Sequence, residues 1–186
     1  MNKAALEFER VSQSLESDAI VNVYYQFDVE GFVNTREIKK LEFEYIPLSK
    51  LILEMASGRY FTFFDSSKFL ENQGYYTLDI KVEESLDIDS KKIIQSEYNQ
   101  WTKFLNEQVS KVDVLWDYLY NNFYQDNPSD LYPKGLEIKF SEHKSIVIAA
   151  SELEIVSGEY NFMCPDEALI VFFSRKFYDK HLGVKN

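Results

Sequence analysis

The sequence predicts an α+β domain in which a largely antiparallel sheet is accompanied by one long helix and a short C-terminal helix. Several stretches alternate between apolar and polar residues, which is the period expected of strands. Between residues 90 and 124, apolar residues instead recur every three or four positions, and this spacing indicates a helix. Short turns rather than crossover helices join several of the expected strands, which favours antiparallel pairing.

Size and composition indicate one folded unit. The chain has 186 residues, of which 45% are hydrophobic, 16% aromatic and 27% charged, so disordered and low-complexity classes are excluded. A chain of 21.9 kDa buries about 70% of its unfolded surface, enough for one core without disulfides or metal ions. We therefore expect residues 1–186 to form a single domain.

The first elements are a helix and two strands. Apolar residues at helical spacing over residues 4–15 predict a helix. Residues 21–29 and 41–45 alternate between apolar and polar side chains and predict strands with one buried face. Because Gly31 and Asn34 signal a turn between them, we expect these two strands to form a hairpin.

A second helix and two further strands are expected next. Pro47 suits the first turn of a helix, and Gly58 suits a left-handed stop, so residues 47–57 are predicted to be helical. Residues 60–64 and 76–82 carry strand patterns.

The helix predicted over residues 90–124 is too long for a straight element. At 1.5 Å per residue it would span roughly 50 Å, whereas a domain of this size is roughly 40 Å across. We place a bend near Val109 to Val112, where helix propensity is poorest. The aromatic residues of its last turns, residues 115–124, exceed one core-facing stripe. They either pack beneath the following loop or form an exposed patch.

The C-terminal third predicts a hairpin, a buried strand and a helix. Residues 136–140 and 146–148 flank a turn, and residues 168–173 form an apolar run typical of a strand covered on both faces. Ser174 is a suitable helix N-cap, and Gly183 a suitable end.

We find no catalytic, metal or cofactor motif. His143, His181 and Cys164 are scattered and lack ligand-spaced partners, and the six glycines do not cluster into a phosphate loop. Carboxylate pairs such as Glu83 and Glu84 are inevitable in a chain with 31 acidic residues. The sequence therefore predicts a non-catalytic protein without a metal ion or cofactor.

Charge and cysteine usage indicate the compartment and the partner. The single cysteine cannot form an internal disulfide, the segment MNKAALEFER lacks a signal-peptide core, and no apolar run reaches the ~20 residues of a membrane helix. We expect a cytoplasmic protein that is not membrane-bound. A net charge of -11 repels nucleic acids and anionic lipids, and favours a basic protein partner.

One acidic stretch stands out as a candidate binding surface. Residues 75–89 contain five acids, two tyrosines and one lysine, and such a strip would steer a basic partner. The alternative interpretation is a solvated strand face followed by a helix cap. The predicted partner-binding residues are Tyr75, Asp79, Glu83, Glu84, Asp87 and Asp89.

The C-terminal segment resembles a known family. The stretch GLEIKFSEHKSIVIAASELEIVSGEY, followed by DEALIVFFSRKFYDKHLG, is similar to the ending of small acidic immunity proteins of bacterial polymorphic-toxin loci. In that ending a hairpin, an Ala-Ala-Ser/Glu segment and an apolar strand run into a short helix. The resemblance covers residues 135–183, about a quarter of the chain. It implies a cytoplasmic inhibitor of a toxin and identifies no binding residues.

These observations favour a non-catalytic binding protein, and above all a toxin-neutralising immunity protein. An enzyme or small-molecule receptor whose polar groups converge only in the fold is the first alternative, and a deep pocket would favour it. A structural or assembly subunit is the second, and the oligomeric state would distinguish it. The sequence itself leaves the oligomeric state open.

Overall fold

The protein is mostly β-structure. A computed structural model describes residues 3–27, 43–47, 49–70, 75–86, 93–95, 100–118 and 131–183. Within these ranges the chain forms twelve strands in three antiparallel sheets, two short α-helices and a 3₁₀ turn. The predicted α+β class with one long helix is therefore wrong, whereas the antiparallel pairing and the short C-terminal helix are confirmed.

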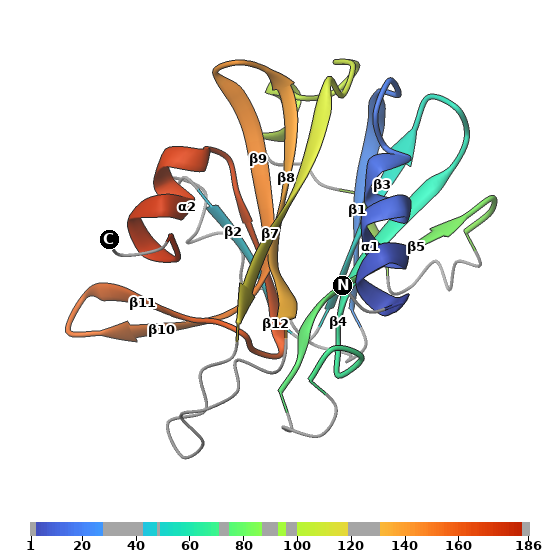
Figure 1. The fold of residues 1–186 in the computed structure, drawn as a ribbon. Coiled ribbons are helices and arrows are strands. Elements are labelled where there is room, and N and C mark those ends of the chain that lie inside the picture. Colours follow the sequence, from blue (N-terminus) through green and yellow to red (C-terminus); the bar gives the residue numbers. More distant parts are fainter. Residues whose placement is uncertain are drawn as a thin grey trace.

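Two five-stranded sheets make up the body of the molecule (Figure 1). The first sheet has the order β5-β4-β3-β1-β6, and the second β2-β12-β9-β8-β7. The strands of the first sheet are β1 (Ile20–Phe27), β3 (Ser49–Met55), β4 (Tyr60–Ser66), β5 (Thr77–Glu83) and β6 (Ile93–Gln95). Those of the second are β2 (Phe43–Pro47), β7 (Lys111–Tyr118), β8 (Leu131–Ser141), β9 (Lys144–Ala150) and β12 (Ala168–Phe172).

The main core lies between the two sheets. Alternate residues of each strand face it, as Leu51 and Leu53 do on β3 and Leu136 and Ile138 do on β8. Helix α1 (Lys3–Gln13) packs against β5, β7 and β8, and buries Phe8 in the same core. The helix predicted over residues 4–15 is thus confirmed, and it covers the side of the body where β5 and β7 are edge strands (Figure 1).

Helix α2 (Arg175–His181) lies on the outer face of the second sheet. Its N-cap is Ser174, whose Oγ accepts a hydrogen bond of 3.1 Å from the backbone N–H of Phe177. Tyr178 of α2 and Phe172 of β12 belong to a second hydrophobic cluster between helix and sheet. Because both clusters contact β12, all five of its residues are buried, as its unbroken apolar run predicts.

The helix predicted over residues 47–57 is wrong, because β3 occupies most of this range. Leu51, Ile52 and Leu53 are three consecutive buried residues, which fits a strand covered on both faces. Gly58 has a φ of 83° but lies in the turn between β3 and β4, so its left-handed conformation serves a hairpin instead of a helix end.

The helix predicted over residues 90–124 is also wrong. Its described parts contain β6, the 3₁₀ turn η3 (Trp101–Lys103) and β7. In β7, Val112, Val114 and Trp116 alternate toward the main core. Val112 and Leu115 also satisfy a helical spacing, so the pattern fits both periods, and the abundance of Val, Asp, Trp and Tyr favours the strand.

The remaining predictions have mixed outcomes. The strands over residues 21–29, 41–45, 60–64 and 76–82 are confirmed as β1, β2, β4 and β5, and the predicted C-terminal hairpin as β8 and β9. The hairpin between the first two strands is wrong, because β1 pairs with β3 and β6, and β2 pairs with β12. Gly31 and Asn34 of its predicted turn lie outside the described residues.

A third sheet continues two strands of the second one. It consists of β10 (Glu152–Val156) and β11 (Glu159–Met163), which follow β9 and precede β12 in the chain. In the second sheet Ala150 pairs with Leu169, whereas in the third Glu152 pairs with Met163, so residues 164–167 are extra on one side. Ser151 ties the junction together, since its N–H donates to Ala168 O and its hydroxyl to Met163 O, both at 2.7 Å.

Candidate protein-binding surface

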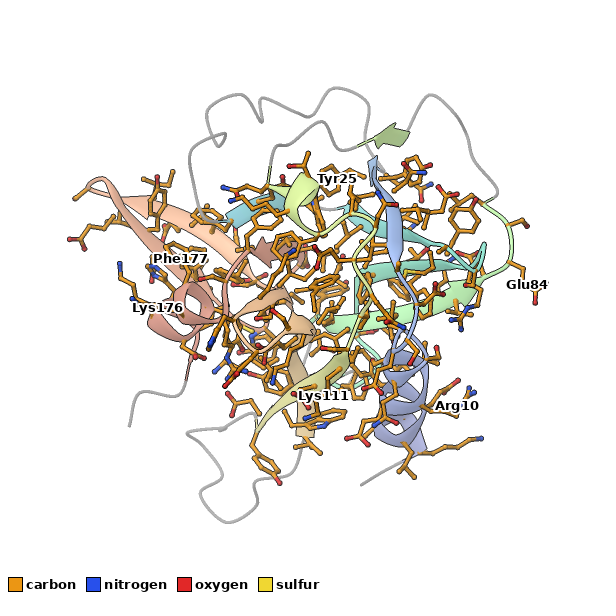
Figure 2. The ribbon with its side chains drawn as sticks, turned by 90° about the horizontal axis from the view of Figure 1, so that it is seen from above. Arg10, Tyr25, Glu84, Lys111, Lys176 and Phe177 are labelled. Atoms are coloured by element: carbon orange, nitrogen blue, oxygen red, sulfur yellow. The ribbon has the colours of Figure 1, made fainter. Side chains whose placement is uncertain are left out.

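The described part of the predicted acidic strip extends along β5 and beyond both of its ends. Tyr75 precedes the strand and is 46% exposed, while Glu84 follows it, and the seven residues of β5 place about 23 Å of strand between them. Figure 2 shows Glu84 at one edge of the molecule, on the side opposite Phe177 of helix α2. Asp87 and Asp89 lie outside the described residues.

Two of the predicted strip residues already have partners. Asp79 is only 6% exposed; Ser66 donates to its Oδ2 at 3.1 Å, and Lys68 Nζ lies 3.6 Å from its Oδ1. Glu83 is half-buried, with Lys81 Nζ at 2.9 Å and a hydrogen bond from Thr62. Asp79 therefore contributes little accessible charge, and a binding role for the exposed Tyr75 and Glu84 stays a prediction.

A different surface has the features expected of a binding site. We call β10, β11 and their connecting turn, residues 152–163, the ribbon; Figure 1 shows it extending away from the two large sheets on the side of α2. Ser157 and Gly158 form its two-residue turn with φ angles of 53° and 84°, which matches the type I′ geometry of tight hairpins. Because residues paired across the strands share a face, the register divides the ribbon into two faces.

One face of the ribbon is apolar and anchors it to the body. We call Leu153, Ile155, Tyr160 and Phe162 the apolar face. The rings of Tyr160 and Phe162 lie 5.4 and 5.3 Å from that of Phe43 on β2, in edge-to-face arrangements. Ile155, which pairs with Tyr160 across the ribbon, is 63% exposed. The ribbon is therefore anchored through the aromatic side chains of β11 and accessible at Ile155 of β10.

His181 of α2 completes the anchor. Its imidazole ring lies 4.8 Å from the ring of Phe162 and 4.6 Å from that of Phe177. Burial and the neighbouring Lys180 lower the pKa of His181, and its Nε2 is buried without a hydrogen-bond partner among the described residues. At neutral pH this side chain therefore acts as an aromatic packing partner, and not as the helix-end cation that its position suggests.

The opposite face of the ribbon is acidic and exposed. We call the following residues the acidic face: Glu152, Glu154, Val156, Glu159, Asn161 and Met163. Its three glutamates form no ion pair with a described residue, and the ribbon contains no lysine or arginine. Val156 is 50% exposed between these charges. Within the described ranges the ribbon thus presents negative charge that no ion pair compensates, beside apolar area, and this combination suits a basic protein partner.

The outer face of the second sheet shows the contrast, because its charges compensate one another. An alternating chain of ion pairs crosses β7, β8 and α2 through Lys111, Asp113, Lys139, Glu137, Arg175 and Asp179. Partial burial raises the pKa of Asp113, but hydrogen bonds from Lys111 and Lys139 lower it further and hold it below its ordinary value. Such mutually paired charges leave little net field for an incoming partner.

One buried carboxyl group has the chemistry that an enzyme would require. Glu44 on β2 is 6% exposed, and the indole N–H of Trp101 donates to its Oε2 at 3.0 Å and to the hydroxyl of Tyr25 at 2.7 Å. Burial raises the pKa of Glu44 to about 8, although the hydrogen bond from Trp101 lowers it. Tyr25 and Trp101 are buried as well, so these described groups meet inside the core instead of lining an open pocket.

Other chemical features are limited in the part of the chain that the structure describes. No group of three or more His, Cys, Asp or Glu residues there is arranged to hold a metal ion. Cys164 is a partly buried free thiol, and burial raises its pKa, which disfavours the reactive thiolate. Neither α1, α2 nor any other described helix has the length and apolar character needed to span a membrane.

The ribbon carries a sequence signal that our predictions missed. Leu153 and Ile155 alternate with glutamates, a Ser-Gly pair follows, and then Tyr160 and Phe162 alternate with polar residues. This is the pattern of a tight hairpin with one apolar face. The sequence does not show that this hairpin separates from the second sheet. The separation occurs at the extra residues 164–167, which only the strand register reveals.

Comparison with known proteins identifies neither a family nor a function for this chain. A fold of this general kind serves many unrelated functions, so function has to be inferred from the ribbon and its charges. No protein-family model, curated protein or solved structure matches the chain.

Proposed function

We propose that this chain is a non-catalytic binding protein, an immunity protein that neutralises a basic toxin domain by seating it on the ribbon. The observation that carries the proposal is the charge of Glu152, Glu154 and Glu159, which pair with no described cation and lie next to the exposed side chains of Ile155 and Val156. Unpaired carboxylates accelerate the encounter with a basic surface, and the apolar side chains add contact area after docking.

The location of the ribbon supports the same function. It lies inside the segment whose sequence resembles polymorphic-toxin immunity proteins. Binding in the cytoplasm agrees with a single free cysteine that needs no oxidising compartment. The anchored apolar face adds a further advantage, because a surface held in place by Phe43 and His181 loses little conformational entropy when the partner docks.

Co-expression in bacteria tests the proposal. The probe is the C-terminal domain of the protein encoded directly upstream of this chain's gene, because toxin and immunity genes are expected to be adjacent. We expect that domain to stop growth and the wild-type chain to restore it. The double variant Glu154→Lys/Glu159→Lys should restore growth poorly, and the association rate of the purified proteins should fall at least tenfold at low salt.

The matched control is Glu83→Lys/Glu84→Lys at the end of β5, which changes the net charge by the same amount on another side of the molecule. This control should retain growth rescue and lose only a small part of the association rate. Loss of binding in the β5 variant alone would move the site to the predicted strip. A toxic upstream domain that the wild-type chain neither binds nor neutralises would refute the immunity function.

A further inference from the structure

In the part of the chain that the structure describes, the strands of the ribbon have unpaired outer edges. In the second sheet, β9 is flanked by β8 and β12, and β12 by β2 and β9. Beyond the junction at Ser151, β10 and β11 pair only with each other among the described residues. Each ribbon strand therefore has one edge whose backbone N–H and C=O groups lack a strand partner there.

The register identifies which backbone groups face outward. Val156 and Glu159 flank the two-residue turn, so they form the hydrogen-bonded pair that closes the hairpin. Hydrogen-bonded and non-hydrogen-bonded pairs alternate along an antiparallel ladder. It follows that Leu153 and Ile155 direct their backbone groups away from β11, toward the open edge of β10.

From this geometry we propose that the partner contributes an extended segment, which pairs with the open edge of β10 and carries basic residues at alternate positions. This inference rests on the proposed function and names the mode of binding. Side chains of an added strand would alternate between the two faces of the ribbon. Those beside Glu152 and Glu154 should be Lys or Arg, and those beside Leu153 and Ile155 should be apolar.

The edge of β10 fits this role better than that of β11. On β10 the acidic face contributes two glutamates, whereas on β11 it contributes Glu159, Asn161 and Met163. The apolar side chains of β11 already pack against Phe43, while Ile155 of β10 is 63% exposed. Charge and accessible apolar area therefore both favour β10.

The same charges disfavour a second copy of this chain as the occupant. Strand edges are commonly protected by proline, lysine or a bulge, and the ribbon has none of these within residues 152–163. If two copies paired through β10, the glutamates of one would lie beside those of the other, and like charges in neighbouring strands repel. A basic strand meets no such repulsion.

A peptide titration of the full-length protein tests the inference. The probe is acetyl-Lys-Val-Lys-Thr-Lys-Val-Lys-amide, monitored by amide hydrogen exchange and NMR shifts. We expect saturating peptide to slow exchange at least tenfold at the amides of Leu153 and Ile155, and to leave those of Tyr160 and Phe162 almost unchanged. The matched peptide with Glu in place of Lys should produce no protection. Absence of protection by the lysine peptide, or equal protection along β11, would overturn the inference.

Two substitutions at one position separate backbone pairing from side-chain contact. Ile155→Ala and Ile155→Pro both remove the side chain, but only proline also removes the outward-facing N–H, which the hairpin itself does not use. We expect the Pro variant to bind the peptide at least fivefold more weakly than the Ala variant. Equal affinities would exclude pairing at this edge. If these tests fail while Glu154→Lys/Glu159→Lys still lowers the rate of toxin association at least tenfold, the ribbon binds by charge alone and the proposed function stands.

Discussion

The two halves of one long hairpin differ completely in their surroundings. Its inner half, β9 and β12, lies in the second sheet between the main core and the cluster under α2, and all residues of β12 are buried. Its outer half, the ribbon, has Leu153 and Phe162 as its most buried side chains, and the rest are exposed. Successive strands of the chain thus serve stability in the inner half and an accessible surface in the outer half.

This contrast teaches that the ribbon depends on the body for its order. A two-stranded hairpin alone is only marginally stable in water. The ribbon has a favourable turn and the contacts of its rings with Phe43, Phe172 and His181. A substitution in the ribbon can therefore lower the free energy of global unfolding only by as much as the ribbon's own opening costs.

The largest expected effect belongs to the body and depends on pH. The pKa of Glu44 is about 8 when folded and 4.5 in the unfolded chain, so folding binds a proton between these values. The stability that protonated Glu44 allows is fully present below pH 4.5 and is lost as the pH rises through 8. Glu44→Gln removes this loss, so its stability relative to wild type should be greater at pH 9 than at pH 4 by on the order of 5 kcal/mol.

Urea denaturation across pH 4 to 9 measures this difference. The free energy of unfolding of the wild type minus that of Glu44→Gln should be constant below pH 4.5. Between pH 5 and 8 this difference should fall by about 1.4 kcal/mol per pH unit. The matched ribbon variant Glu154→Gln, at an exposed carboxylate, should follow the wild-type curve. A flat difference curve for Glu44→Gln would show that the carboxyl group titrates normally.

The second effect compares isoleucines in the two halves of the hairpin. Ile170 of β12 is fully buried in the cluster under α2, whereas Ile155 is 63% exposed. Ile170→Ala should lower the free energy of unfolding by about 3 kcal/mol, because it removes buried methyl groups and leaves a cavity. Ile155→Ala should change it by less than about 0.5 kcal/mol. Equal losses in chemical denaturation would mean that the ribbon tip packs against the body.

Strands with one clear period were predictable from the sequence, because side chains alternate between faces whatever the rest of the chain does. β1, β5 and β8 belong to this class. β12 was predictable for another reason, as a short and unbroken apolar run, and helix α2 from its N-cap Ser174. The strand β3 was not predictable in this way. Residues Leu51 to Leu53 are apolar on both faces, so they fit the period of a helix as well as that of a strand. In β7 the apolar residues fit a helical spacing through Leu115 as well as the alternation of a strand. Only packing against the facing sheet decides such cases.

The position of the candidate site could not be predicted from the sequence, and the basic partner stays a prediction. Composition alone indicated an acidic surface for a basic partner. It could not show that Asp79 is neutralised by Lys68, because Lys68 comes from the loop after β4. Nor could it bring Glu44 to Trp101, which lies 57 residues away in the chain. The alternation of apolar and polar residues in the ribbon is visible in the sequence. Its open edges are not, because they arise where β10 and β11 lack the outer neighbours, β8 and β2, that β9 and β12 have in the described sheet.

The smallest expected effect compares two glycines in equivalent backbone conformations. Gly58, in the turn between β3 and β4, and Gly158, in the ribbon turn, have φ angles of 83° and 84°, and an added Cβ would meet no atom within 4 Å at either. Alanine is therefore strained by the backbone alone, by about 1 kcal/mol. Gly58→Ala should lower the global free energy of unfolding by that full amount. Gly158→Ala should lower it less, because the ribbon opens before the body unfolds, and should instead speed amide exchange at Val156 and Glu159. Identical global losses would show that ribbon and body unfold as one unit, and the proposed partner strand would then dock on a surface as rigid as the core itself.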